Sequence, residues 1–160
     1  MNIFTGTIHA KTDVKGRVFV PATFRKILQS MGGEGLILRK DIHQSCLALY
    51  PEKVWEEVLN KRQEELDDWG DEDRLQTFRM ISAFTEPVDL DSSGRILIPK
   101  KYLQAAKISN TVCFVGMNKY IEIWNPDQFT KVMLSADDLK SNVRKFLSNS
   151  RRANENSGQS

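Results

Sequence analysis

The sequence has little of the chemistry that marks metalloproteins, secreted proteins or membrane proteins. Two cysteines and two histidines occur in 160 residues, and Cys46 and Cys113 stand in apolar stretches without the spacing of metal ligands. We therefore expect two buried thiols in a reducing compartment, not a disulfide framework. No uncharged apolar run approaches the roughly 20 residues of a membrane helix. The first twenty residues contain four charged side chains and no apolar signal segment, so we expect a cytoplasmic protein.

Charge is distributed unevenly along the chain, although the formal net charge is only +2. Residues 51–73 contain ten acidic and three basic side chains, which gives this segment a charge of −7. The remainder therefore carries +9. A basic remainder of this size favours a polyanionic partner. Many solvated surfaces separate charge in the same way, so the partner has to be argued from motifs.

An internal repeat organises the chain. Residues 13–21 read Asp-Val-Lys-Gly-Arg-Val-Phe-Val-Pro, and residues 91–99 read Asp-Ser-Ser-Gly-Arg-Ile-Leu-Ile-Pro, at an offset of 78 residues. The Asp, Gly, Arg and Pro coincide, as do the two aliphatic positions before the proline. At residue frequencies of roughly 5–7% each, four fixed residues at one spacing recur by chance about once in 10⁵ starting positions. The repeat is therefore real, and it predicts two copies of one structural unit.

Each copy predicts the same order of elements: a strand, a tight turn, a strand, a short helix and two more strands. The helices begin at Pro21 and Pro99, because proline is favoured at a first helical position. The other predicted strands cover 3–10, 36–38, 46–50, 85–90, 112–115 and 120–124. About 50 residues are too few to bury a good core alone. We therefore expect the two copies to complete each other.

The repeat divides the chain into five segments. We expect a first repeat over 3–53, a helical linker over 54–82, a second repeat over 83–126, C-terminal helices over 127–148 and a disordered tail over 149–160. The polar composition of the last twelve residues predicts the tail. Apolar stripes predict the helices of the linker and the C-terminal segment. Their residues are Trp55, Val58, Leu59, Leu66, Leu75, Phe78, Ile81, Leu139, Val143, Phe146 and Leu147.

The repeated motif predicts a hairpin turn that holds an arginine at its end. The turn-organising residues are Asp13, Gly16, Asp91 and Gly94. The aspartate accepts hydrogen bonds from backbone amides of its own turn, and the glycine supplies a positive φ. Arg17 and Arg95 follow at the head of the next strand, four residues after the aspartates. Strand alternation places Phe19 and Leu97 on the same face as these arginines, and places the aliphatic residues between and after them toward the core.

Two interpretations of these turns stay open. In the first, each Asp–Arg pair only stabilises its turn, but an exposed ion pair contributes little to stability. In the second, Arg17 and Arg95 form a symmetry-related pair that binds an anion, since a guanidinium suits bidentate contacts with phosphate or with a guanine edge. Further basic residues near the turns in sequence would widen this patch: Lys11, Lys15, Arg25, Lys26, Lys100 and Lys101.

The hairpins resemble those of the MraZ family, bacterial transcriptional regulators with two tandem SpoVT-AbrB-like domains. The resemblance covers most of the chain and rests on Phe4-x-Gly6, Asp13-x-Lys15-Gly16-Arg17, Pro21-x-x-Phe24-Arg25, Cys46-Leu47-x-Leu49-Tyr50-Pro51, Asp91-x-x-Gly94-Arg95-Ile96-Leu97-Ile98-Pro99, Val115-Gly116 and Ile121-Glu122-Ile123-Trp124. Ser92 and Ser93 depart from the pattern, because they leave the second turn without a counterpart of Lys15. On this basis the second hairpin is expected to hold phosphate less strongly.

The resemblance implies both a fold and a partner. The implied fold is α+β, mainly β, with the two half-domains interleaved in one pseudo-two-fold swapped-hairpin barrel. The implied partners are double-stranded DNA, at direct repeats in a promoter, and the protein itself in a ring-like homo-oligomer. The implied target is the division and cell-wall gene cluster that includes its own gene. We expect the DNA-binding residues to be Arg17, Arg95, Lys15, Lys11, Arg25, Lys100 and Lys101.

No cofactor, metal, membrane or small-molecule substrate is expected, and the protein is expected to be cytoplasmic and nucleoid-associated. An enzyme is one alternative, but His9 and His43 lack a catalytic partner at a recognisable spacing. The glycine-rich segment 32–35 follows a helix and lacks the Lys-Ser/Thr of a phosphate loop. Each turn aspartate has an arginine that would hold it ionised, which suits binding better than acid–base catalysis. The other alternative is a protein-interaction or assembly scaffold with purely structural Asp–Arg turns.

Overall fold

The computed structural model describes residues 3–32, 35–62, 70–133 and 136–158. Residues 63–69 of the acidic segment, which include Leu66, and residues 33–34 of the glycine-rich segment lie outside these ranges. The chain forms two compact units, Met1–Phe129 and Thr130–Ser160. No helix among the described residues is long and apolar enough to cross a membrane.

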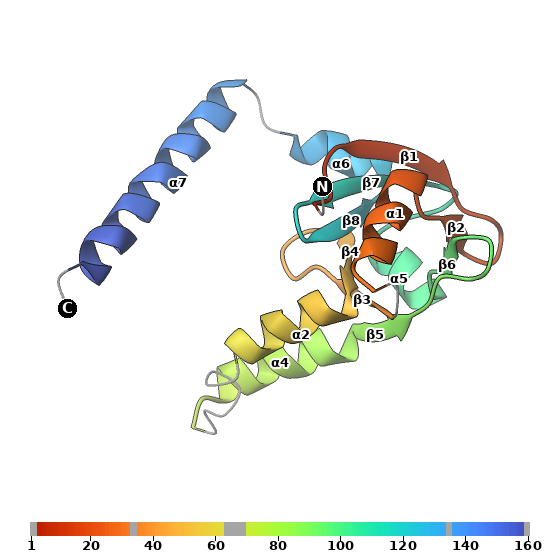
Figure 1. The fold of residues 1–160 in the computed structure, drawn as a ribbon, viewed down its shortest axis with the longest axis horizontal. Coiled ribbons are helices and arrows are strands. Elements are labelled where there is room, and N and C mark those ends of the chain that lie inside the picture. Colours follow the sequence, from red (N-terminus) through yellow and green to blue (C-terminus); the bar gives the residue numbers. More distant parts are fainter. Residues whose placement is uncertain (1–2, 33–34, 63–69, 134–135, 159–160) are drawn as a thin grey trace. The chain divides into compact units, whose positions relative to one another are not determined.

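Both repeats contain the predicted elements in the predicted order (Figure 1). The first repeat consists of β1 (Thr7–Lys11), β2 (Arg17–Phe19), α1 (Ala22–Ser30), β3 (Leu36–Lys40) and β4 (Cys46–Pro51). The second repeat consists of β5 (Thr85–Val88), β6 (Arg95–Leu97), α5 (Lys100–Ala105), β7 (Thr111–Met117) and β8 (Tyr120–Trp124). The remaining helices are α2 (Glu52–Lys61), α4 (Glu72–Ala83), α6 (Pro126–Val132) and α7 (Ala136–Ser157).

The strands show how the two repeats share one fold. Six of them form an antiparallel sheet in the order β1-β7-β8-β4-β3-β5, and β2 pairs with β6 in a separate two-stranded ribbon. The first strand of each repeat therefore pairs with the third strand of the other: β1 with β7, and β5 with β3. This pairing confirms that the two copies complete each other, and the fold is α+β with mostly antiparallel strands.

The register gives the sheet and the ribbon a common pseudo-two-fold relation. In the ribbon, Val18 lies opposite Ile96, and these residues are equivalent in the repeat. In the six-stranded sheet, β4 and β8 are the central pair. Ala48 and Glu122, the middle residues of the strands predicted over 46–50 and 120–124, lie opposite each other with aliphatic pairs on both sides. Equivalent residues thus face each other at the centre of both sheets. A pseudo-two-fold axis through these centres therefore relates the two repeats.

The core is built from the side chains that strand alternation and helix periodicity predict. Val18, Val20, Ile96 and Ile98 are each at most 1% exposed. The helix faces bury Phe24 and the equivalent side of α5 against the same cluster. Fully burying an aliphatic or aromatic side chain stabilises a fold by about 1.5–3 kcal/mol. The two cysteines are free and buried, as expected for small apolar side chains.

Several strand boundaries differ from those expected, and the start of the first strand differs most. The first strand begins at Thr7 instead of residue 3, because Gly6 has a φ of +81° that interrupts the extended backbone. Before this glycine, Phe4 forms an isolated bridge with Asn118 and is fully buried. The strand expected over 85–90 ends at Val88.

The linker forms two helices that extend from one end of the sheet (Figure 1). α4 begins after Asp71, whose carboxylate accepts the Arg74 amide as an N-cap at 3.1 Å. Apolar side chains of both linker helices line a shared groove of about 610 Å³ with the β3–β4 loop. Of the predicted linker stripe, Trp55, Val58, Leu59, Phe78 and Ile81 line this groove.

The C-terminal end requires a correction. A disordered tail is expected from residue 149, but α7 continues as a helix to Ser157. Polar composition predicts exposure, and every side chain described in this stretch is exposed. Polar residues can still extend a helix that has already formed, because propagation avoids the cost of nucleation. The apolar stripe of α7 is also exposed, with Phe146 the most exposed at 70%.

Candidate nucleic-acid interface

The first hairpin turn holds its arginine through one carboxylate. Asp13 Oδ1 accepts the backbone amides of Lys15 and Arg17, each at 2.9 Å. Its Oδ2 accepts Nε of the Arg17 side chain at 2.6 Å. The amide of Gly16, at a φ of +91°, donates to the Asp13 carbonyl at 3.1 Å. One aspartate therefore fixes both the backbone of the turn and the direction of the guanidinium.

The second turn repeats these bonds with nearly the same lengths. Asp91 Oδ1 accepts the amides of Ser93 and Arg95 at 2.9 Å each, and Oδ2 accepts Arg95 Nε at 2.8 Å. The amide of Gly94, at a φ of +87°, donates to the Asp91 carbonyl at 3.0 Å. The predicted turn geometry is confirmed in both copies.

The hydrogen bonds also stabilise the ionised form of both aspartates. The bond from the Arg17 amide is the largest cause that lowers the pKa of Asp13, and the Arg95 amide does the same for the pKa of Asp91. Both carboxylates are therefore ionised at neutral pH. The bonds to the aspartates engage only Nε of each guanidinium. The terminal Nη groups have the planar, two-donor edge that suits phosphate or guanine.

Each turn is supported by the opposite repeat. The amide of Val20 donates to the Gly94 carbonyl at 3.0 Å, and the amide of Ile98 donates to the Gly16 carbonyl at 2.9 Å. A Cβ added to Gly16 would lie 2.6 Å from the Ile98 carbonyl oxygen, closer than real Cβ contacts. The turns are thus pressed against backbone of the other half, which restricts their movement.

The outward face of the β2–β6 ribbon carries both arginines. Arg17 lies opposite Leu97, and Arg95 lies opposite Phe19, so charged and apolar side chains alternate across the ribbon. The side chains of Arg17 and Arg95 are 37% and 30% exposed. The Arg95 guanidinium carbon lies 5.7 Å from the centre of the Phe19 ring, within the range of a cation–π contact. The ribbon therefore offers two oriented cations on one exposed surface.

The neighbours of the two turns differ in a way that the repeat motif does not reveal. The side chain of Arg25, on α1, packs directly over Gly94 of the second turn. Its Nη1 donates to the Ser93 carbonyl at 3.5 Å. The equivalent position on α5 is Leu103, whose Cδ1 would lie 3.1 Å from a Cβ on Gly16. The first turn thus has its own Lys15, whereas the second turn receives a positive charge from the first repeat.

The structure does not bring all the predicted basic residues to the ribbon equally. Lys11 is exposed and ends β1 two residues before the first turn, and Lys100 is exposed at the start of α5. Lys101 points elsewhere: its Nζ lies 3.5 Å from Glu86 and 5.1 Å from the Tyr102 ring centre. Lys101 is therefore engaged at the β5 edge, whereas Arg25 contacts a turn directly.

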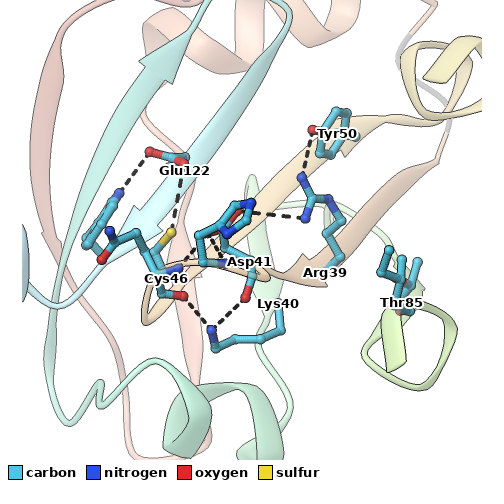
Figure 2. A network of polar contacts seen from close by, with 11 residues as sticks. Arg39, Lys40, Asp41, Cys46, Tyr50, Thr85 and Glu122 are labelled. Atoms are coloured by element: carbon cyan, nitrogen blue, oxygen red, sulfur yellow. Dashed lines mark hydrogen bonds and ion pairs between the residues drawn. The ribbon is translucent and has the colours of Figure 1, made fainter. Parts of the chain in front are cut away.

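A polar cluster between β4, β8 and the β3–β4 loop was not predicted from sequence (Figure 2). It brings together Asp41, Cys46 and Glu122, whose ligand atoms all lie within 4.8 Å of one another. The Cys46 thiol donates to Glu122 Oε2 at 3.8 Å, and Trp124 Nε1 donates to Oε1 at 3.1 Å. Burial raises the pKa of the Glu122 carboxyl and, more strongly, the pKa of the Cys46 thiol. The only sequence signal was a glutamate within an apolar strand.

These residues are the described set best able to hold a metal ion, but their atoms already have protein partners. Asp41 Oδ2 accepts the amides of His43 and Gln44 at 3.0 and 2.8 Å, which closes the β3–β4 loop. Its Oδ1 lies 3.9 Å from Arg39, and Arg39 Nη2 donates to the Tyr50 hydroxyl at 3.1 Å. The arrangement fastens the loop to the sheet through bonds between protein groups.

Comparisons with known proteins match this chain over both repeats. Residues 3–78 and 81–146 match a family model described as "MraZ protein", with the further term "antitoxin-like". The "Transcriptional regulator MraZ" of Bacteroides thetaiotaomicron is 42% identical over 149 residues, covering 93% of this chain and 95% of that protein. The protein of the same name from Phocaeicola vulgatus is 44% identical over 144 residues, covering 90% and 93%. That from Rhodospirillum rubrum is 33% identical over 126 residues, covering 79% and 81%.

Proposed function

Because the chain belongs to the MraZ family, whose members named above are transcriptional regulators, we propose that it regulates transcription by binding double-stranded DNA through the β2–β6 ribbon. The observation that carries this proposal is the pair of arginines that two equivalent carboxylate bonds orient on one exposed face. A two-stranded β-ribbon fits the major groove, where arginine makes bidentate contacts with guanine.

The pre-orientation of the guanidinium groups supports binding over a purely structural role. Each aspartate accepts a hydrogen bond from Nε of its arginine and leaves the terminal Nη groups for a ligand. Because the guanidinium is already oriented, less conformational entropy is lost on binding. Lys15 and Arg25 add one further cation beside each turn. Lys11 and Lys100 extend the proposed patch toward phosphates, and Lys101 joins it only if its contact with Glu86 opens.

Several finer points belong to the same proposal. The DNA target is a set of direct repeats in the promoter of the division and cell-wall gene cluster, which includes the protein's own gene. One subunit has one ribbon, so several subunits in a ring-like homo-oligomer would bind spaced repeats with greater avidity. The exposed apolar stripe of α7 supports self-association. We further infer a closed swapped-hairpin barrel, a cytoplasmic and nucleoid-associated location, and no catalytic activity.

A binding titration at several salt concentrations tests the proposal. The probes are a duplex from upstream of the protein's own gene and a duplex of the same composition in shuffled order. We expect tighter binding to the first, and an affinity for both that falls with salt, because phosphate contacts release counterions. Equal weak binding to both duplexes, or binding that does not respond to salt, would favour the assembly-scaffold alternative.

A further inference from the structure

Two large apolar side chains occupy the DNA-facing surface that the proposed function assigns to the ribbon. Phe19 is 53% exposed and Leu97 is 52% exposed, although Val18 and Ile96 beside them are buried. They are equivalent in the repeat and both are located on the outward face with the arginines. A solvated ribbon would be expected to carry polar side chains at such positions.

The register arranges these four outward side chains as a two-by-two array. Arg17 and Arg95 occupy one diagonal, and Phe19 and Leu97 occupy the other. Diagonal neighbours across an antiparallel pair are about 7–8 Å apart, which spans about two base steps of ~3.4 Å. Each apolar side chain is therefore next to the base position that an arginine of the same ribbon would reach.

We propose that Phe19 and Leu97 contact the 5-methyl groups of thymines that neighbour the bases bound by Arg17 and Arg95. The thymine methyl is the apolar group that a base edge presents in the major groove. Burying it against a half-exposed apolar side chain removes apolar surface of both partners from water. The inference rests on the proposed function, and it adds a preference for thymine that the arginines alone do not provide.

Removal of single methyl groups from the DNA tests this inference directly. A duplex is selected from a random pool with the full chain, and each thymine is then replaced by deoxyuridine, which differs only in the missing methyl. Wild-type affinity should fall about four-fold at a contacted thymine, as expected for one buried methyl-sized group. The variants Phe19→Ala and Leu97→Ala should bind the thymine and uracil duplexes equally at the thymine that each side chain contacts.

Phe19 also lies beside Arg95, so a positioning role has to be separated from a contact. The variant Phe19→Leu keeps an apolar side chain and removes the aromatic ring. If Phe19 contacts a methyl group, this variant should remain sensitive to uracil. Equal losses on thymine and uracil duplexes in Phe19→Ala and Phe19→Leu would show that the ring only positions Arg95 and would overturn the inference.

The experiment distinguishes failure of this inference from failure of the proposed function. If the selection with the wild-type chain yields no specific duplex, both are overturned. If a specific duplex is obtained and Arg17→Ala weakens its binding, but no uracil substitution reduces wild-type affinity, then the DNA-binding function is supported and the methyl contact is excluded. Because both apolar side chains are half exposed, circular dichroism should show intact folds for all variants.

Discussion

The two hairpin turns have the same backbone and the same aspartate–arginine bonds, but different surroundings. The turn of the first repeat has Lys15 within it and Leu103 packed against its glycine. The turn of the second repeat has Ser92 and Ser93 instead, with Arg25 packed over its glycine. The bonds that orient the arginines are thus retained in both copies, while the second positive charge comes from the turn itself in one case and from the opposite repeat in the other.

This difference changes what the two turns are expected to do. Ser92 and Ser93 alone suggest that the second hairpin holds phosphate less strongly. Arg25 replaces the missing charge from outside the motif, because interleaving of the repeats places α1 of the first beside the turn of the second. We therefore expect the two turns to be similar in binding strength and different in their sensitivity to mutation.

The largest effect is expected when the feature common to both turns is removed. Arg17→Ala and Arg95→Ala should each reduce DNA affinity by about 1–3 kcal/mol per base-edge contact and should relax sequence preference. In an oligomer the loss should exceed that of a single contact, because every subunit carries the change. Binding titrations against specific and shuffled duplexes measure both effects.

A matched control removes one arginine at a position away from the ribbon, so that the change in net charge is the same. Arg79→Ala, on α4, removes an exposed arginine that pairs with Glu72 at 2.8 Å. Its DNA affinity and sequence preference should remain near those of the wild type. Wild-type affinity in both ribbon variants, with folding and assembly intact, would show that the repeated turn is only structural.

The next largest effect is expected on the stability of the fold when the glycine of either turn is replaced. Gly16→Ala places a Cβ against the Ile98 carbonyl oxygen, whereas Gly94→Ala meets the movable side chain of Arg25. Each forces a left-handed conformation, which costs about 1–2 kcal/mol for a residue with a Cβ. Gly16→Ala should be the more destabilising of the two, because backbone cannot move aside as a side chain can. Urea denaturation of both variants measures the difference, and an equal loss would contradict it.

A smaller effect should follow from exchanging the neighbours of the turns. Arg25→Leu gives the second turn the surroundings of the first without its lysine, so DNA binding should weaken on all sequences. The slope of log affinity against log salt should become less steep by about 0.9 if Arg25 contacts one phosphate. Leu103→Arg, which adds a cation beside the first turn, should increase that slope. Unchanged slopes in both variants would place Arg25 outside the interface.

The smallest effect concerns pH. Amide bonds lower the pKa of Asp13 and of Asp91 below the ordinary value of 3.8. A carboxyl whose pKa is lower in the folded state than in the unfolded state stabilises the fold at pH values above its unfolded-state pKa. This contribution is lost as the pH falls through the folded-state pKa. Below about pH 4, the free energy of unfolding of the wild type should therefore decrease more steeply with falling pH than that of the double variant Asp13→Asn/Asp91→Asn. Urea midpoints between pH 7 and pH 3 provide the measurement, and parallel curves would exclude these aspartates as a cause.

Local features of the fold were predictable because they depend on residues close together in the chain. Asp and Gly at fixed spacing determine the turn, and the alternation around Val18 and Ile96 determines the buried side of the ribbon. The helix starts follow from Pro21 and Pro99 in the same way. Both orienting bonds to Arg17 and Arg95 were expected on these grounds.

That the repeats complete each other was expected, but the individual side-chain contacts that their pairing creates were not predictable. The contact of Arg25 with Gly94 requires α1 to lie beside the second turn. Arg25 and its hydrogen-bond partner Ser93 are 68 residues apart in the sequence. The cluster around Glu122 requires β4 and β8 to pair in one register. Composition also misjudged the end of α7, since polarity reports solvent contact and not backbone conformation.

The pairing of β2 with β6 has a consequence for how the protein becomes active during synthesis. The two strands that carry Arg17 and Arg95 are separated by about half of the chain, and β1 cannot pair until β7 has been made. Such distant pairings cannot form until the second strand has left the ribosome, and they fold slowly relative to local structure. A translation product interrupted before Arg95 lacks one side of the ribbon and one of its cations. Under the proposed function, abortive fragments would therefore not compete with the finished protein for DNA.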